Sequence, residues 1–216
     1  MDISDSLINS AADGDIARMS LMFAASYGNN EILKKLMANG IDVNSKENSI
    51  GMTPLMLAAS AGHLDTVKLL IQMRADVNAL DGLGNSAFFY ACRMGHFDIV
   101  KYLIDQNMQI NSKQTVFGMS ALMLAVISGH ADIIELLVEH GADLNAKDNN
   151  GVSAMTLATV AGMSDIVEYL ISRGADVNTE NNAGWTVLML AREKGHEEIV
   201  KILEKAGAKE IVHPIH

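Results

Sequence analysis

Four histidines in this chain recur with a spacing that first raises the possibility of a metal site. His63, His96, His130 and His196 each follow a glycine. Histidine is a common zinc ligand, but ligands must lie near 2 Å from the ion that they share. Successive helical units pack about 10 Å apart, so side chains one unit apart cannot reach a common ion. These histidines are therefore predicted to be structural residues at helix starts.

The remaining chemical candidates are equally weak. His213 and His216 end the chain as His-Pro-Ile-His, which is either an adventitious metal site or, as we favour, a frayed terminus. His196 opens a His-Glu-Glu sequence but lacks the second histidine that zinc proteases carry four residues on, where Val200 stands. A zinc-protease site is therefore not predicted.

Two further features have structural explanations. Cys92 occupies a position typical of a buried small residue, and we expect it to behave as one rather than as a nucleophile. The sequence Gly82-Leu83-Gly84 lacks the third glycine and the preceding strand of a phosphate loop. The sequence therefore predicts no enzymatic activity, no catalytic residue, no metal site and no cofactor.

Composition narrows the class of protein further. The chain has 16 basic and 26 acidic residues, a formal net charge of -10, and no basic cluster of the kind that nucleic-acid binding requires. It is 49% hydrophobic but only 5% aromatic, with two prolines, which favours helices packed on helices. A nucleic-acid partner is not expected. The acidic balance is read as a source of solubility, with steering toward a basic partner as the alternative.

The single cysteine permits no internal disulfide and suits a reducing compartment. The first residues lack the pattern of a signal peptide, and no apolar run is long enough to span a bilayer. A cytoplasmic location without membrane association is therefore expected. Export or injection into a host cell remains compatible with the sequence.

An internal repeat organises the whole chain. Its markers are glycines spaced 33 or 34 residues apart: Gly28, Gly62, Gly95, Gly129, Gly162 and Gly195. Leu-Met-Leu-Ala precedes three of these glycines, and each unit closes on Ala-Asp-Val-Asn or a close relative. A period of this length indicates a stack of supersecondary units.

Each unit contains the signals for two helices. Thr53-Pro54 places a capping hydroxyl before a proline at the first helical position, and Ser86, Ser120, Ser153 and Thr186 occupy the same cap position in later units. The marker glycine ends the first helix, and the second is predicted from about Leu64 to Ile71. Another glycine usually ends the second helix. Asn107 replaces it tolerably, whereas Arg74 should cost about 1 kcal/mol if its backbone is left-handed.

These motifs resemble the ankyrin repeat. Thr53-Pro54-Leu55-Met56 is similar to the family's Thr-Pro-Leu-His signature, and Asp81-Gly82-Leu83-Gly84 and Asp148-Asn149-Asn150-Gly151 are similar to its turn. The resemblance implies an all-α fold, a solenoid of stacked helix-turn-helix repeats with projecting β-turn loops. Methionine replaces the signature histidine in four units. One extra residue enters the turns before Gly51 and Gly118, so those two turns should be longer.

The repeats give the predicted boundaries of one continuous domain. Near the start, Leu7 to Asp15 resembles a shortened unit in which a helix is stopped by Gly14-Asp15. The last unit is the most charged, as a terminal cap should be. The expected segments are an N-terminal capping helix at 1–17, repeats at 18–46, 47–80, 81–113, 114–147 and 148–180, a C-terminal capping repeat at 181–210, and a tail at 211–216.

A protein partner is expected on one concave strip. The resemblance implies that residues beside the turn glycine and just before the marker glycine point into it. Apolar residues are unusual at turn tips, and exposed apolar surface commonly marks an interaction site. The predicted protein-binding residues are Tyr27, Ile50, Met52, Leu83, Asn85, Arg93, Met94, Phe117, Met119, Ile127, Val152, Val160, Trp185 and Glu193.

Three functions follow from this reading, in order of preference. The first is a monomeric, non-enzymatic protein-protein interaction module that acts as an adaptor, inhibitor or scaffold. The second is a structural or self-associating unit. The third, a metal-dependent or enzymatic activity, has no feature in its favour. The recurrent sequence Leu-Met-Leu-Ala resembles sequences found in bacterial proteins, some of which are secreted effectors.

Overall fold

The computed structural model describes residues 14–106 and 108–209. The chain divides into two compact units, residues 1–109 and 110–216, and each has its own stack of helix pairs. The expectation of one continuous domain stays a prediction. The predicted helix before residue 14, Asn107 as a helix stop and the tail at 211–216 lie outside the described residues.

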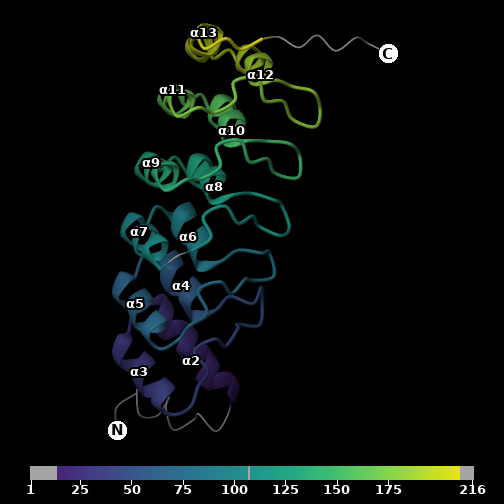
Figure 1. The fold of residues 1–216 in the computed structure, drawn as a ribbon. Coiled ribbons are helices and arrows are strands. Elements are labelled where there is room, and N and C mark those ends of the chain that lie inside the picture. The colour runs from purple at the N-terminus through teal and green to yellow at the C-terminus, as the bar shows by residue number, and fades with distance from the viewer. Residues whose placement is uncertain (1–13, 107, 210–216) are drawn as a thin grey trace. The chain divides into compact units, whose positions relative to one another are not determined.

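The described residues of unit 1 form three helix pairs, and a short loop joins the two helices of each pair (Figure 1). The inner helices α2, α4 and α6 pack side by side and the outer helices α3, α5 and α7 form a second layer. The turns that connect one pair to the next project from the inner side. The pairs are α2 (Gly14–Ser26) with α3 (Asn30–Ala38), α4 (Pro54–Ala61) with α5 (Leu64–Gln72), and α6 (Ala87–Met94) with α7 (Phe97–Asp105).

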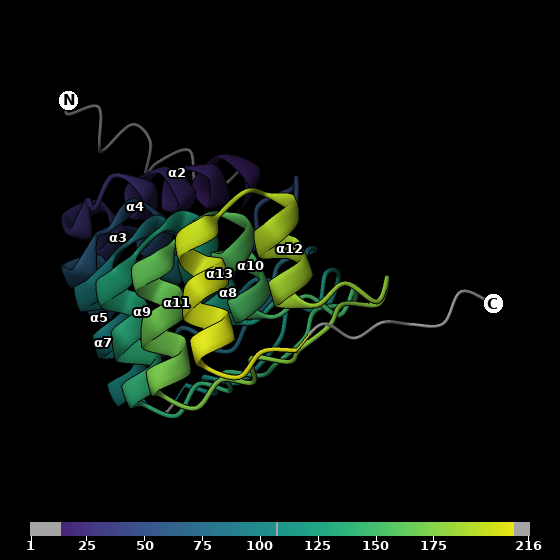
Figure 2. The same ribbon diagram turned by 90° about the horizontal axis from the view of Figure 1, so that it is seen from above.

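Unit 2 repeats the same arrangement. Its inner helix α10 packs against α8 and α12, and the outer helices α9, α11 and α13 lie on the side away from the projecting turns (Figure 2). The pairs are α8 (Ala121–Ser128) with α9 (Ala131–Glu139), α10 (Ala154–Val160) with α11 (Ser164–Ser172), and α12 (Val187–Glu193) with α13 (Glu197–Lys205). Both units therefore confirm the predicted alternation of inner and outer helices.

The inner helices start where the sequence predicts. The side chains of Thr53, Ser86, Ser120, Ser153 and Thr186 each accept a hydrogen bond from the backbone N–H three residues later, at 3.2–3.4 Å. Each bond satisfies an N–H that the helix itself leaves without a partner. In two units methionine completes the cap, because its sulfur accepts the N–H of the cap residue at 3.4 and 3.5 Å.

The start of the first inner helix departs from the prediction. Gly14 and Asp15 were expected to stop a preceding helix, whereas they form the first turn of α2. Asp15 is favourable there because a carboxylate in the first turn interacts well with the helix dipole. The expected stop at Gly14-Asp15 is therefore wrong.

The core consists mainly of aliphatic side chains, methionine and alanine, and Phe88 and Phe89 are among its largest fully buried side chains. Paired alanines such as Ala58-Ala59 in α4 are fully buried and let neighbouring inner helices approach closely. Cys92 is also fully buried in α6, as predicted, and its burial raises the pKa of the thiol. A buried neutral thiol is a poor nucleophile, so Cys92 contributes packing.

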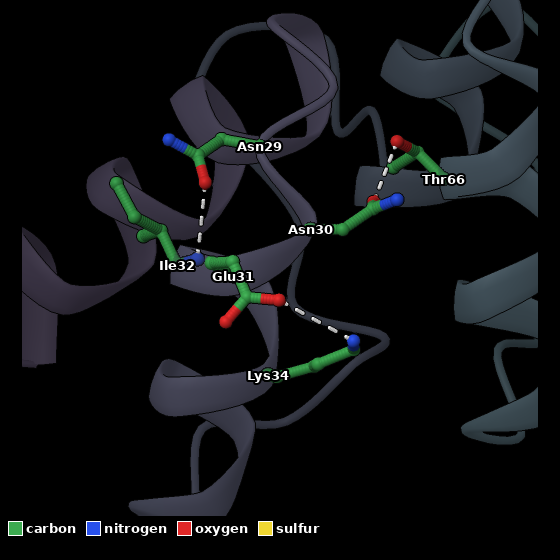
Figure 3. A network of polar contacts seen from close by, with 6 residues as sticks. All are labelled: Asn29, Asn30, Glu31, Ile32, Lys34 and Thr66. Atoms are coloured by element: carbon green, nitrogen blue, oxygen red, sulfur yellow. Dashed lines mark hydrogen bonds and ion pairs between the residues drawn. The ribbon is translucent and has the colours of Figure 1, made fainter.

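Polar contacts at the outer helices tie neighbouring pairs together in unit 1 (Figure 3). The Asn29 side chain accepts the N–H of Ile32 and caps α3, while the Thr66 hydroxyl of α5 donates to Asn30 Oδ1 at 2.8 Å. An exposed ion pair joins Glu31 to Lys34 within α3. Such a surface pair contributes little to stability. The bond from Thr66 is a polar contact that links α5 to α3.

The closing Ala-Asp-Val-Asn motif provides a second tie between repeats. Asn44 Oδ1 accepts the backbone N–H of Asp76 at 2.8 Å, and Asn145 Oδ1 accepts that of Asp176 at 2.9 Å. The asparagine thus reaches the equivalent loop of the next repeat. This role gives a structural reason for the recurrence of the motif.

Arg74 takes the left-handed conformation that its position in the repeat suggested, with φ 66°. Its equivalents Gly40, Gly141 and Gly174 have positive φ at no steric cost. We therefore expect Arg74→Gly to raise the free energy of unfolding by about 1 kcal/mol. Urea denaturation followed by circular dichroism measures the change, and an unchanged or lower midpoint would contradict the assignment of backbone strain.

Candidate protein-binding surface

The projecting turns are closed by backbone hydrogen bonds, and a side chain of the turn braces those that begin at Glu47, Asp81, Asp148 and Asn181. In the shorter turns the N–H of Asp81, Asp148 and Asn181 donates to the carbonyl four residues later, at 2.9–3.0 Å. The Oδ1 of the same residue accepts two backbone N–H groups inside its turn. A short acceptor side chain therefore holds each shorter turn in one conformation.

The two turns with an extra residue are longer, as predicted. Their closing bonds run from Glu47 to Met52 and from Gln114 to Met119, which is one residue more than in the other turns. Glu47 performs the bracing because its longer side chain spans the longer turn: the carboxylate accepts the hydroxyl and N–H of Ser49 and the N–H groups of Ile50 and Met52. These bonds, first those of Ser49, lower the pKa of Glu47 to about 2.

Neighbouring turns are also joined to each other within each unit. In unit 1, Gly82 N–H donates to the Ile50 carbonyl at 2.6 Å and the Lys46 ammonium donates to the Leu80 carbonyl at 2.8 Å. In unit 2, Asn182 N–H donates to the Asn150 carbonyl at 2.9 Å. The turn tips in each unit therefore form a row whose backbone is fixed.

Three of the four repeated histidines make structural contacts of the kind predicted. Nε2 of His63 and of His96 lies 2.9 Å from the carbonyl oxygen of Ser26 and of Ser60, at the end of the preceding inner helix. His196 makes the equivalent contact with Val160 at 3.2 Å. Within residues 14–106 and 108–209 no cluster of three or more His, Cys, Asp or Glu could hold a metal ion.

Most predicted binding residues are exposed beside these turns and inner helices. Phe117 and Trp185 are 54% and 38% exposed at turn tips of unit 2. Met52, Met119 and Val152, next to the helix caps, are half-buried. The other exposed members of the predicted set are Tyr27, Ile50, Leu83, Arg93, Met94, Ile127, Val160 and Glu193.

The predicted place of Asn85 on the binding surface is corrected by the structure. It is only 3% exposed, and its backbone and side-chain amide both donate to the Asp81 carboxylate. The prediction treated Asn85 as a polar surface residue, but its hydrogen bonds draw it into the turn. It braces the turn and offers no surface to a partner.

A buried polar network surrounds that turn. The Tyr90 hydroxyl donates to Asp81 Oδ2 at 2.6 Å, and the Arg93 guanidinium lies 5.0 Å above the Tyr90 ring. Burial and the adjacent carboxylate raise the pKa of Tyr90 to about 12. Burial alone would raise the pKa of Asp81, but bonds from Tyr90 and Asn85 outweigh it and lower that pKa. The network therefore fixes Arg93 at the exposed face as a cation above an aromatic ring.

Sequence reasoning missed one row of residues on the inner helices. These residues come four positions after the cap, as Leu57 and Tyr90 do, and the equivalent residue in α2 is Phe23. The prediction included positions one before and seven or eight after the cap, and a residue four after the cap shares that helix face. Helical spacing alone could therefore have identified Phe23, which is strongly exposed.

The exposed side of α2 carries an apolar surface of which the prediction included only Tyr27, just after the helix. Ile16, Met19, Phe23 and Tyr27 follow one another at helical spacing, and all four are exposed. The Phe23 and Tyr27 rings stack with their centroids 6.3 Å apart. Met19 and Phe23 also line a groove of about 650 Å³ in unit 1, between α2 and the turn at 47–52.

Paired helices with projecting turns, repeated within both units, define a helical repeat protein. A family model described as ankyrin repeats, in three copies, matches residues 21–114, 110–181 and 148–212. The chain belongs to the ankyrin repeat family, whose members generally mediate protein-protein interactions. No helix in the described part of the chain is both long and apolar enough to cross a membrane.

Two solved structures illustrate the similarity. One is an ankyrin repeat domain from Acinetobacter baumannii AYE, with 30% identity, a TM-score of 0.79, and coverage of 88% of this chain and 98% of that one. The other is a chain from the predatory endopeptidase Bd0816 of Bdellovibrio bacteriovorus in complex with immunity protein Bd3460, with 28% identity, a TM-score of 0.77, and coverage of 86% and 97%. No curated protein matches the sequence.

Proposed function

We propose that this protein is a non-enzymatic binding module that holds a protein partner against its turn tips and inner helices. The observation that carries the proposal is the exposure of large apolar side chains on turns held by backbone hydrogen bonds, above all Phe117 and Trp185 in unit 2. Aromatic residues fixed on a rigid scaffold are typical interface anchors, because little conformational entropy is lost when they are covered.

A role as an inhibitor or immunity-type protein is the form of this function that we favour. The structure containing immunity protein Bd3460 pairs it with an endopeptidase, which is a folded protein partner. Arg93 and Glu193, exposed on the inner helices of their own units, supply charges for selecting that partner. Such binding requires little change of shape in the rigid repeat.

Removing both aromatic anchors should abolish this binding. We expect Phe117→Ala/Trp185→Ala to weaken capture of the partner from a native lysate at least tenfold, because truncating central aromatic anchors typically has such an effect. The variant should keep its helical content, since both side chains are exposed. Quantitative pull-down, with circular dichroism as the folding check, measures the two effects.

The matched control is Glu135→Ala/Glu168→Ala, which changes two exposed residues on outer helices of the same unit. Its capture should equal that of the unaltered protein. Equal capture by the aromatic double variant would refute the proposed surface. Light scattering over a concentration series separates the preferred monomeric binder from a self-associating unit, because only the latter gains mass with concentration.

A further inference from the structure

The groove between α2 and the turn at 47–52 has one fixed wall. Ile50 and Met52 stand on that wall, and the four bonds accepted by Glu47 fix the turn that carries them. The bond from Gly82 N–H to the Ile50 carbonyl anchors the same turn to its neighbour. The Ile50 side chain is therefore presented to the groove on a backbone that needs no ordering when a ligand binds.

The opposite wall is adaptable. Met19 and Phe23 line it from α2, with Met22 buried at its base. Methionine is unbranched and polarisable and adjusts to irregular apolar surfaces. Pockets of a few hundred cubic ångströms bury a few side chains, so a groove of about 650 Å³ matches a short extended segment of a partner.

The charged residues that line the groove indicate which charge the bound segment should carry. Its charged lining residues are Asp15, Glu47 and Arg18, and Arg18 is already paired with Asp15. The Glu47 carboxylate stays ionised at neutral pH because its pKa is about 2. The lining therefore carries two negative charges and one positive charge, and the chain as a whole carries a net charge of -10.

We propose that this groove binds an extended segment of the partner in which a large apolar side chain is followed or preceded by lysine or arginine. The apolar side chain lies between Phe23 and Ile50, and the basic side chain lies beside Asp15 and Glu47. This inference rests on the proposed protein-binding function and names the chemistry of the segment recognised. Charge complementarity steers its approach, and apolar burial supplies most of the affinity.

A random 12-residue peptide library displayed on phage, panned against the whole protein, tests the proposal. The expected consensus contains an aromatic or large aliphatic residue within two positions of Lys or Arg. A labelled synthetic peptide of that consensus then gives dissociation constants by fluorescence anisotropy. Replacing its basic residues by Glu should weaken binding at least fivefold, and raising the ionic strength should weaken binding of the basic peptide.

Two isoleucines provide a matched pair of variants. Ile50 and Ile16 are 38% and 39% exposed, but Ile50 lines this groove whereas Ile16 does not and lines a separate hollow on α2. Ile50→Ala should weaken peptide binding at least fivefold, and Ile16→Ala should leave it unchanged. Both changes truncate an isoleucine side chain of similar exposure. A general loss of stability would therefore affect both variants.

Three results would overturn the proposal: no enriched peptide, an acidic or purely polar consensus, or equal loss with Ile16→Ala and Ile50→Ala. These results are distinguishable from failure of the proposed function. If the partner is captured normally by Ile50→Ala but lost by Phe117→Ala/Trp185→Ala, the protein binds through its turns without using this groove.

Discussion

Replacing Gly62 by alanine is expected to lower the free energy of unfolding by about 3 kcal/mol. Gly62 ends α4 in the left-handed conformation, with φ 82°, which costs a residue with a Cβ about 1–2 kcal/mol. The added Cβ would also lie 2.6 Å from Cε1 of His96. The His96 ring resists displacement because its Nε2 is bound to the Ser60 carbonyl.

Gly40 separates the backbone cost from the steric cost. It has φ 86° in the same unit, but a Cβ there meets no atom within 4 Å. Gly40→Ala should therefore cost about 1 kcal/mol, the backbone contribution alone. Urea denaturation followed by far-ultraviolet circular dichroism compares the two variants.

A double-variant cycle isolates the contact with His96. In a His96→Ala background, Gly62→Ala should cost no more than Gly40→Ala, because the ring that the Cβ would strike is absent. An undiminished cost in that background would contradict the packing role assigned to the pair of marker glycine and following histidine. This cycle therefore tests whether His96 has a structural role in packing against Gly62.

The fold was predictable because each repeat contains its own complete set of local signals. The Thr53 and Ser120 caps and the glycine at position 62 specify where an inner helix begins and ends without reference to distant residues. Even Arg74 was identifiable as strained, because it stands where other units have glycine. The start of α2 was mispredicted because Gly14 was assigned a stopping role from its residue type alone.

The binding surface was only partly predictable. The repeat identifies equivalent positions in each unit, but it does not show which neighbouring residues cover each of them. Ile32 is half-buried in the first described repeat, whereas its equivalents Thr66 and Ile99 are each 1% exposed beneath the preceding repeat. Phe23 is 57% exposed, whereas its equivalent Leu57 in α4 is half-buried and its equivalent Tyr90 in α6 is 5% exposed. The prediction for Asn85 failed for a different reason. Asn85 is buried because of the hydrogen bonds that it makes to Asp81, and its position in the repeat does not reveal those bonds.

Two phenylalanines of unit 1 should show that stability and binding depend on different residues. Phe88 of α6 is fully buried, and Phe88→Ala should lower the free energy of unfolding by about 3–5 kcal/mol because it removes a large side chain and leaves a cavity. Phe23 of α2 is 57% exposed. Phe23→Ala should change the free energy of unfolding by less than about 1 kcal/mol.

The measurement is a pair of urea denaturation curves, combined with anisotropy titrations of the labelled consensus peptide. Phe23→Ala should shift the denaturation midpoint only slightly. It should weaken binding of the peptide by at least fivefold, because the Phe23 ring forms a wall of the groove. A cost for Phe23→Ala near that of Phe88→Ala would mean that the Phe23 ring is already covered within the protein. The ring could then not serve a partner, and the adaptable wall assigned to the groove would have to be abandoned.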